Sequence, residues 1–125
     1  MRTMLKSKIH RACVTNLCID YEGSITIDKK LMNEADILPY EQVHVLNLNN
    51  GIRFTTYAIE GARDNGQICL NGASARLAQR GDIILILSYC QVEDSKASNF
   101  LPRFVYLDSK NRIIETRRAI ENIPF

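Results

Sequence analysis

The sequence predicts a mainly β, single-domain protein, either a barrel or a sandwich, with a few short helices. Two-residue alternation and short apolar runs dominate the chain, and turn residues flank most of these segments. The chain has 125 residues, which is the size of one ordinary domain and too short for two. Many short strands separated by turns in one small domain are typical of barrels and sandwiches.

Seven segments have the pattern of strands. They are residues 9–15, 25–27, 43–48, 52–59, 67–70, 83–89 and 103–107. Asn49-Asn50-Gly51 between two of them indicates a hairpin turn, because Asn and Gly tolerate the positive φ that such turns need. Residues 64–66 (DNG) and 108–111 (DSKN) are predicted to form two further turns.

Two or three short helices fit between the strands. Asp28 can cap a helix over residues 29–35, because its carboxylate can accept a hydrogen bond from a free backbone N–H. Residues 73–79, followed by Gly81, form a second candidate, and residues 95–99 a third. The segment after about Asn111 is more polar and lacks a clear partner, so we expect residues 112–125 to be a peripheral tail.

Composition and charge exclude several classes of protein. Apolar residues make up 46% and charged residues 24%, which argues against a disordered chain. A net charge of +2 is too balanced for a chain whose main work is to neutralise nucleic-acid phosphates. No apolar run approaches the roughly 18 residues that span a membrane, and Lys6, Lys8, His10 and Arg11 interrupt any signal peptide. We expect a cytoplasmic protein with no nucleic-acid or membrane partner.

The cysteines predict no metal site. They are Cys13, Cys18, Cys69 and Cys90. They occur singly in apolar segments without a C-x-x-C pair, and His10 and His44 do not supply the missing ligands. The simplest interpretation is four small, buried, free thiols in a reducing compartment.

Gly23-Ser24 is the first of several candidate chemical groups. One interpretation is a plain turn entering a strand, since about 0.6 Gly-Ser pairs are expected by chance at this length. The other is that the Ser24 hydroxyl attacks the carbonyl that precedes it, because glycine permits the strained backbone that this attack needs.

Polar residues of the segment 52–59 form a second group. Arg53, Thr55 and Tyr57 share one face of the predicted strand, and Thr56 lies on the other. From this segment alone, a polar exterior face is the simpler interpretation.

Two further groups are less specific. Asn71-Gly72-Ala73 opens a predicted helix whose free N–H groups can receive an anion or an oxyanion, or it is a simple turn with an Asn cap. Lys8 and His10 lie two residues apart, on one face of the first strand, where exposed side chains are common.

In combination these groups resemble a known family. LKSKIHRACVT is followed by YEGS, NGIRFTTYAI, NGASA and RGDIILI, in the order and spacing of the pyruvoyl-dependent aspartate 1-decarboxylases. The resemblance covers residues 1–90 and is loose after about Leu101. The set YEGS, RFTTY and NGA is more specific than any one of these motifs.

The resemblance implies a double-psi β-barrel that is made as an inactive proenzyme. The chain would cut itself between Gly23 and Ser24 into residues 1–23 and 24–125, and Ser24 would become a covalent pyruvoyl group. This group would form a Schiff base with L-aspartate and yield β-alanine for pantothenate and coenzyme A synthesis, without a metal or pyridoxal phosphate. Family members are homotetramers with active sites between subunits. The resemblance leaves open whether an accessory protein promotes the cleavage.

The resemblance also assigns roles to residues. Ser24 is the pyruvoyl precursor, Gly23 carries the carbonyl that Ser24 attacks, Thr56 assists this cleavage, and Tyr57 is the proton donor. Arg53 holds a substrate carboxylate, for which its planar guanidinium is suited. The other residues implied to bind substrate are Lys8, His10, Asn71, Gly72 and Ala73.

Two positions depart from the family pattern. Leu46 stands where many relatives carry Trp, and Ser74 where many carry Ala; both changes can alter pocket shape or processing rate. In an ideal strand Thr56 points away from Arg53 and Tyr57, so a shared site needs a bulge, a twist or two subunits.

Two other functions remain as alternatives. One is a non-enzymatic module related to DNA-binding swapped-hairpin barrels, against which the near-neutral charge argues. The other is a proenzyme-like protein that assembles but never cleaves, against which the retained Ser24, Thr56 and Tyr57 argue.

Overall fold

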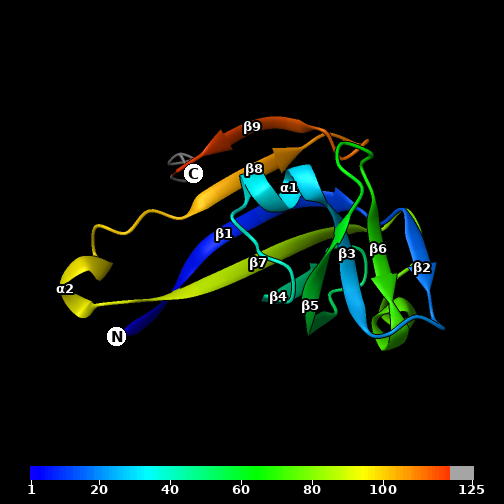
Figure 1. The fold of residues 1–125 in the computed structure, drawn as a ribbon, viewed down its shortest axis with the longest axis horizontal. Helices are drawn as coiled ribbons and strands as arrows, with labels where there is room; N and C mark the ends of the chain where they lie inside the picture. The colour runs from blue at the N-terminus through cyan, green and yellow to red at the C-terminus, as the bar shows by residue number, and fades with distance from the viewer. Residues whose placement is uncertain (119–125) are drawn as a thin grey trace.

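The computed structural model describes residues 1–118, which are mainly β (Figure 1). The strands are β1 (Arg2–Cys13), β2 (Asn16–Cys18), β3 (Ser24–Asp28), β4 (Gln42–Asn47), β5 (Arg53–Gly61), β6 (Ile68–Asn71), β7 (Ile83–Val92), β8 (Arg103–Leu107) and β9 (Ile113–Arg117). The helices are α1 (Lys29–Glu34), α2 (Asp94–Ala97) and the 3-10 helix η1 (Gly72–Leu77). The predicted fold class, mainly β with a few short helices, is confirmed.

The nine strands of residues 1–118 belong to one mixed sheet of order β2-β6-β3-β5-β4-β7-β1-β8-β9. Three pairs are parallel, β1–β8, β2–β6 and β3–β5. The residue Thr15, just after β1, contacts the start of β6, which lies far from β1 in the strand order: Thr15 N–H donates to Ile68 O at 2.8 Å. The core is largely aliphatic, and its fully buried side chains include Ile9, Ile25, Ile27, Val43, Val45, Ile68, Leu70, Ile84 and Ile86. This arrangement is consistent with the barrel that the resemblance implies.

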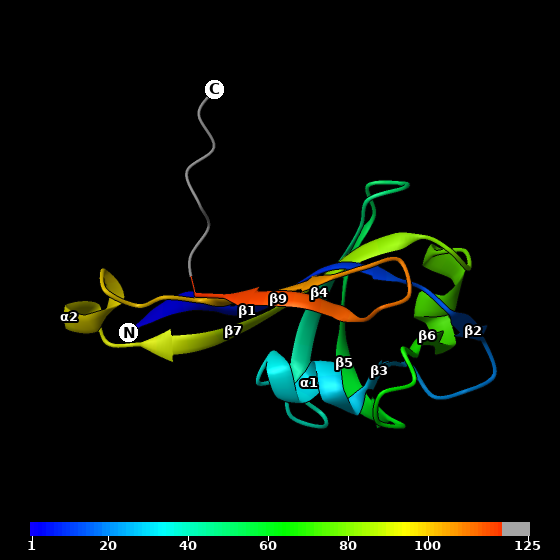
Figure 2. The same ribbon diagram turned by 90° about the horizontal axis from the view of Figure 1, so that it is seen from above.

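β1 and β7 extend together as a two-stranded arm toward α2 (Figure 2). Their antiparallel pairing runs from Arg2↔Val92 to Cys13↔Ile83. The sequence-based prediction started the first strand at residue 9 and ended the other at residue 89, so it was wrong about the arm. The arm is largely half-exposed and lacks the apolar alternation from which strands are predicted. The three-residue strand β2 was missed as well.

The segment after Asn111 is not a peripheral tail, which corrects the expectation from sequence. β9 pairs antiparallel with β8, and Ile113 packs against the core. The carboxylate of Asp108 accepts hydrogen bonds from the backbone N–H groups of Lys110 and Arg112 at 2.8 and 3.0 Å, which fixes the turn predicted there. Residues 119–125 of the predicted tail lie outside the described residues.

Asp28 connects α1 to the predicted turn at residues 64–66. As expected, its carboxylate caps the helix, accepting from Lys30 N–H at 2.8 Å. The same buried carboxylate accepts from the N–H groups of Asp64 and Gly66, also at 2.8 Å. The second predicted helix is instead the 3-10 helix η1, which starts one residue earlier than expected.

The cysteines correct a second expectation. All four are free, but only Cys69 is buried; Cys13 and Cys90 are half-buried, and Cys18 is exposed. Within residues 1–118, no helix has the length and apolar character to cross a membrane. The same residues contain no group of three or more His, Cys, Asp or Glu side chains that could hold a metal ion.

Candidate active site

Ser24 begins β3, and its side chain is buried, with 1% of the residue exposed. Its Oγ donates a hydrogen bond to Glu22 O at 3.1 Å and accepts one from Asn71 Nδ2 at 2.9 Å. The antiparallel pairing of β3 with β6 makes Ser24 and Asn71 direct partners. The hydroxyl is therefore held in a defined position inside the protein.

The Asn71 side chain serves this network and does not cap η1, so the simple Asn-cap interpretation is wrong. Its Nδ2 also donates to Thr26 Oγ1 at 2.9 Å, and its Oδ1 accepts from the Cys69 thiol at 3.2 Å. Burial raises the pKa of the Cys69 thiol, and Cys18 adds to this, which keeps the S–H donor in place. The thiol thus holds the amide with its NH₂ group toward Ser24.

Gly72 allows η1 to approach the predicted cleavage loop. Its φ is +64°, and a Cβ at this position would lie 2.7 Å from Gly23 Cα and 2.8 Å from Gly23 N. Backbone conformation and close approach both require glycine here. Gly72 therefore packs directly against the backbone of Gly23.

A cavity of about 340 Å³ lies beside the predicted cleavage point. It is lined by Gly23, Phe54, Thr55, Thr56, Tyr57, Ala73, Ser74 and Leu77. The structure thus brings together four residues that the sequence assigned to one site: Gly23, Thr56, Tyr57 and Ala73. Ser74, one of the two departures from the family pattern, lines the same cavity.

The arrangement of β5 explains how adjacent residues share the cavity. β3 pairs with β5 only from Ile25↔Ala58 onward, while β4 covers the other edge of β5. The edge of β5 before Ala58 is therefore unpaired on the side of β3 and leaves room for the cavity. Thr56 and Tyr57 both line the cavity, while Arg53 does not.

Tyr40 is a neighbour of the site that sequence analysis missed. Its ring centroid lies 6.2 Å from that of Tyr57, and the residue is 78% exposed. Its loop is fastened by Glu41, whose carboxylate accepts from Leu38 N–H and pairs with the Lys6 ammonium at 2.6 Å. No periodic pattern marks such a loop residue.

Thr26, also missed, could have been found because it shares a face of β3 with Ser24.

Arg53 lies at the start of β5 and is exposed. It pairs across the strands with Leu46, the other position that departs from the family pattern. Arg53 is not among the residues that line the cavity. The exposed guanidinium of Arg53 is accessible to a carboxylate, as its predicted role requires, and it lies on the strand that carries Thr56 and Tyr57.

Lys8 and His10 lie on β1, three strands away from β5 in the sheet order. The His10 ring packs edge-on against Tyr106, with centroids 5.4 Å apart. Partial burial lowers the pKa of His10, and the charges of Lys8 and Arg11 lower it further. A single chain does not bring these two residues into the cavity beside Gly23.

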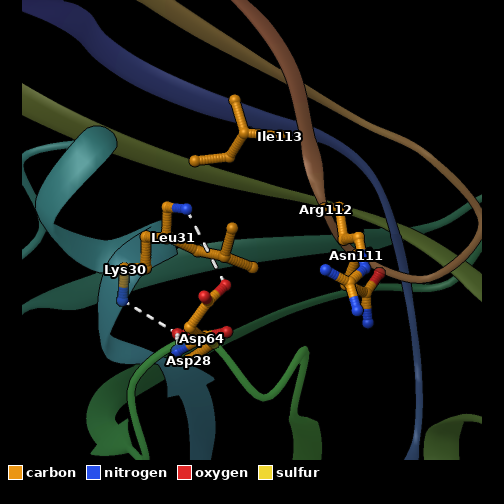
Figure 3. A pocket seen from close by; sticks show the side chains of 7 residues that line it. All are labelled: Asp28, Lys30, Leu31, Asp64, Asn111, Arg112 and Ile113. Atoms are coloured by element: carbon orange, nitrogen blue, oxygen red, sulfur yellow. Dashed lines mark hydrogen bonds and ion pairs between the residues drawn. The ribbon is translucent and has the colours of Figure 1, made fainter.

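A second cavity, of about 260 Å³, lies between α1 and the β8–β9 hairpin. Its lining residues are Asp28, Lys30, Leu31, Asp64, Asn111, Arg112 and Ile113. Figure 3 shows Asp28 and Asp64 beside one another, with Asn111 and Arg112 at the other side. Three backbone N–H groups donate to the Asp28 carboxylate, and Asp64 pairs with Lys30 at 3.7 Å. The buried Asn111 amide donates to Cys13 O and Gly66 O, so we interpret this cavity as a structural junction.

Comparison with known proteins identifies the family. The aspartate decarboxylase family model matches residues 1–114. The chain belongs to the aspartate decarboxylase family. The match extends past Leu101, where the sequence motifs had indicated only a loose resemblance. Family membership favours an enzyme over a DNA-binding module.

Similar proteins support this membership. An aspartate 1-decarboxylase of Thermoanaerobacter pseudethanolicus is 60% identical over 111 residues, covering 89% of this chain and 95% of the relative. One from Dehalococcoides mccartyi strain CBDB1 is 56% identical over 119 residues, covering 95% and 96%. Aspartate 1-decarboxylase 2 of Gloeobacter violaceus is 49% identical over 122 residues, covering 98% of both chains.

Proposed function

We propose that this protein converts L-aspartate to β-alanine and CO₂ after cutting itself between Gly23 and Ser24. The observation that carries the proposal is the buried Ser24 hydroxyl, held by Asn71 and Glu22 beside a cavity. The names of the similar proteins support the same substrate and reaction. We place the activity in the cytoplasm, where its product serves pantothenate and coenzyme A synthesis.

Maturation begins with an attack of Ser24 Oγ on the carbonyl carbon of Gly23, which replaces the amide by an ester. The Ser24 Cα proton then leaves to water, the Cβ–Oγ bond breaks, and Gly23 departs as a carboxylate. Water hydrolyses the resulting dehydroalanine to a ketone and ammonia. Asn71 orients the hydroxyl, and Thr56, which lines the same cavity as Gly23, assists cleavage.

The surroundings of position 24 fit the covalent pyruvoyl group. Its formation removes the hydroxyl and the amine of Ser24 and so adds no volume to a buried position. Once formed, the group supplies an electron-withdrawing carbonyl for the substrate amine, so that no metal or pyridoxal phosphate is needed. The other tasks fall to side chains: Arg53 binds a substrate carboxylate, and Tyr57 donates a proton to the substrate carbon.

A neighbouring subunit completes the proposed site. Lys8 and His10 lie three strands away from β5 and do not line the cavity of their own chain. A homotetramer with active sites between subunits places them beside the Ser24 of a neighbour. An accessory protein is a further proposed partner, which would bind the precursor and promote its cleavage.

Activity of the Ser24→Ala variant tests the proposed function. Purified wild-type protein should release β-alanine and CO₂ from L-aspartate, whereas Ser24→Ala should release neither, because alanine has no oxygen to form the ester. Ser98→Ala, which changes an exposed serine after α2, is the control and should behave like the wild type. β-Alanine formation by Ser24→Ala at the wild-type rate would overturn the proposal.

A further inference from the structure

Ser74 is a buried hydroxyl that the mechanism described so far does not use. It lies in η1, is 8% exposed and lines the cavity beside Gly23. Its Oγ lies 2.8 Å from Asn71 O and 3.5 Å from Ser24 O, within hydrogen-bonding distance of both carbonyl oxygens. The resemblance implies alanine at this position in many relatives, and alanine lacks this donor.

The two contacts compete for one proton, because a serine hydroxyl carries a single donor hydrogen. In the resting chain Asn71 O is the better acceptor, because it lies closer to Ser74 Oγ than Ser24 O does. Rotation about the C–O bond redirects the proton to Ser24 O without any movement of the backbone. A contact that is long at rest tightens when charge develops on its acceptor.

Charge develops on Ser24 O in one step of the proposed maturation. When the Ser24 Cα proton leaves to water, the electron pair of the C–H bond is shared with the neighbouring carbonyl, and its oxygen becomes partly negative. That pair then forms the Cα=Cβ bond, and the Cβ–Oγ pair leaves with the Gly23 carboxylate. The preceding acyl shift places its negative charge on Gly23 O instead.

We propose that the Ser74 hydroxyl stabilises the negative charge that develops on Ser24 O, and that it thereby accelerates the elimination step of maturation. The inference rests on the proposed self-cleavage and adds a hydrogen-bond donor for one of its two steps. Asn71 serves the other step, because its amide contacts the attacking Oγ. The buried, low-dielectric position of Ser74 strengthens such a hydrogen bond.

The test follows freshly synthesised precursor by intact mass, with and without hydroxylamine. Hydroxylamine attacks the ester and releases residues 1–23 without any elimination, so it reports the acyl shift alone. Removing a donor from an oxyanion costs about 100- to 1,000-fold in rate. Because Ser74 is a neutral donor shared with Asn71 O, we expect Ser74→Ala to slow spontaneous cleavage by about 10- to 100-fold. Hydroxylamine-driven cleavage should stay within about twofold of the wild type.

Two further measurements separate chemistry from structure. Ser74→Cys keeps a weak donor and should cleave at a rate between those of wild type and Ser74→Ala. Precursor carrying deuterium at the Ser24 Cα should mature more slowly than protonated precursor in Ser74→Ala, because breaking the C–H bond then limits the rate. The Ser24→Ala chain is not processed. Its thermal unfolding midpoint, compared with that of the double variant Ser24→Ala/Ser74→Ala, therefore measures how much the loss of the Ser74 hydroxyl destabilises the fold.

Three results would overturn the inference. One is spontaneous cleavage of Ser74→Ala at the wild-type rate. Another is an equal loss of spontaneous and hydroxylamine-driven cleavage, which would place Ser74 in the acyl shift or in folding. The third is the absence of a deuterium effect in Ser74→Ala. A wild-type chain that never cleaves would instead overturn the proposed function itself.

Discussion

At the scale of single residues, the site depends on contacts between positions far apart in sequence. Asn71 meets Ser24 across 47 positions because β3 and β6 are adjacent strands, and Gly72 meets Gly23 because it lacks a side chain. The motifs predicted that these residues belong together. They could not predict the contact between Asn71 and Ser24. An Asn before a helical turn ordinarily caps the helix, whereas Asn71 binds Ser24 instead.

Tyr57 and Thr56 should separate turnover from maturation. Tyr57→Phe removes only the hydroxyl and keeps the ring, so the chain should still cut itself while β-alanine formation falls by about 100- to 10,000-fold. Thr56→Val keeps the shape of the side chain but removes the hydroxyl, so uncleaved chain should accumulate. A mass spectrum of each variant beside its β-alanine production decides between the two roles. Blocked cleavage in Tyr57→Phe with normal maturation of Thr56→Val would reverse the assignment.

Sequence analysis assigned a set of residues to one site, and the structure shows where four of them lie. Gly23, Thr56, Tyr57 and Ala73 do line one cavity, although the ideal-strand rule put Thr56 and Tyr57 on opposite faces. The four residues that line the cavity on β5 are consecutive, Phe54 to Tyr57, and β3 does not pair with this part of the strand. Which edge of a strand is unpaired depends on the whole sheet and cannot be predicted from local alternation.

At the scale of secondary-structure elements, short polar turns determine where strands begin and end. The turns at residues 49–51, 64–66 and 108–111 were predicted correctly, because Asn, Asp and Gly accept positive φ there. β9 was missed even though its turn was predicted, since three of its five residues are exposed and the strand shows little apolar pattern. The β1–β7 arm was missed for the same physical reason.

Asp28 should be one of the most sensitive positions outside the site. Asp28→Ala leaves three backbone N–H groups without their acceptor, in α1 and in the turn at residues 64–66. Hydrogen bonds to a buried charged group typically contribute about 1.5–3 kcal/mol each, so a loss of about 2–5 kcal/mol is expected after relaxation. Urea unfolding in the Ser24→Ala background, at one protein concentration, measures it.

Asp94→Ala is the matched control for Asp28→Ala. Asp94 makes an exposed ion pair with Arg2, at 3.0 Å, and such pairs contribute little to stability. Its replacement should leave the urea midpoint nearly unchanged. Equal midpoints for the two variants would show that the bonds to Asp28 do not hold α1 to its neighbouring turn.

At the scale of the whole molecule, the position of Lys8 and His10 makes the proposed activity depend on assembly. Both residues lie on β1, while Ser24, Thr56 and Tyr57 lie on β3 and β5. Neither Lys8 nor His10 lines the cavity that holds Thr56 and Tyr57 in its own chain. The account therefore requires that each functional site draws on two copies of the chain.

Mixed oligomers test this requirement. Ser24→Ala and Lys8→Ala should each be inactive or nearly so when expressed alone. Co-expressed, they should regain part of the activity, because some sites combine the pyruvoyl group of one chain with the Lys8 of another. Mixed oligomers that contain both chains but form no more β-alanine than the separate variants would place the whole site in one subunit.

The intact mass of the purified, denatured wild-type protein tests the central claim most directly. The account predicts two species: residues 1–23 with an ordinary carboxyl terminus, and residues 24–125 lighter than the unmodified sequence by the elements of ammonia. Ser24→Ala, treated in the same way, should give one species with the mass of the full chain. A wild-type protein that forms β-alanine from L-aspartate while it remains a single uncut chain of full mass would contradict the account.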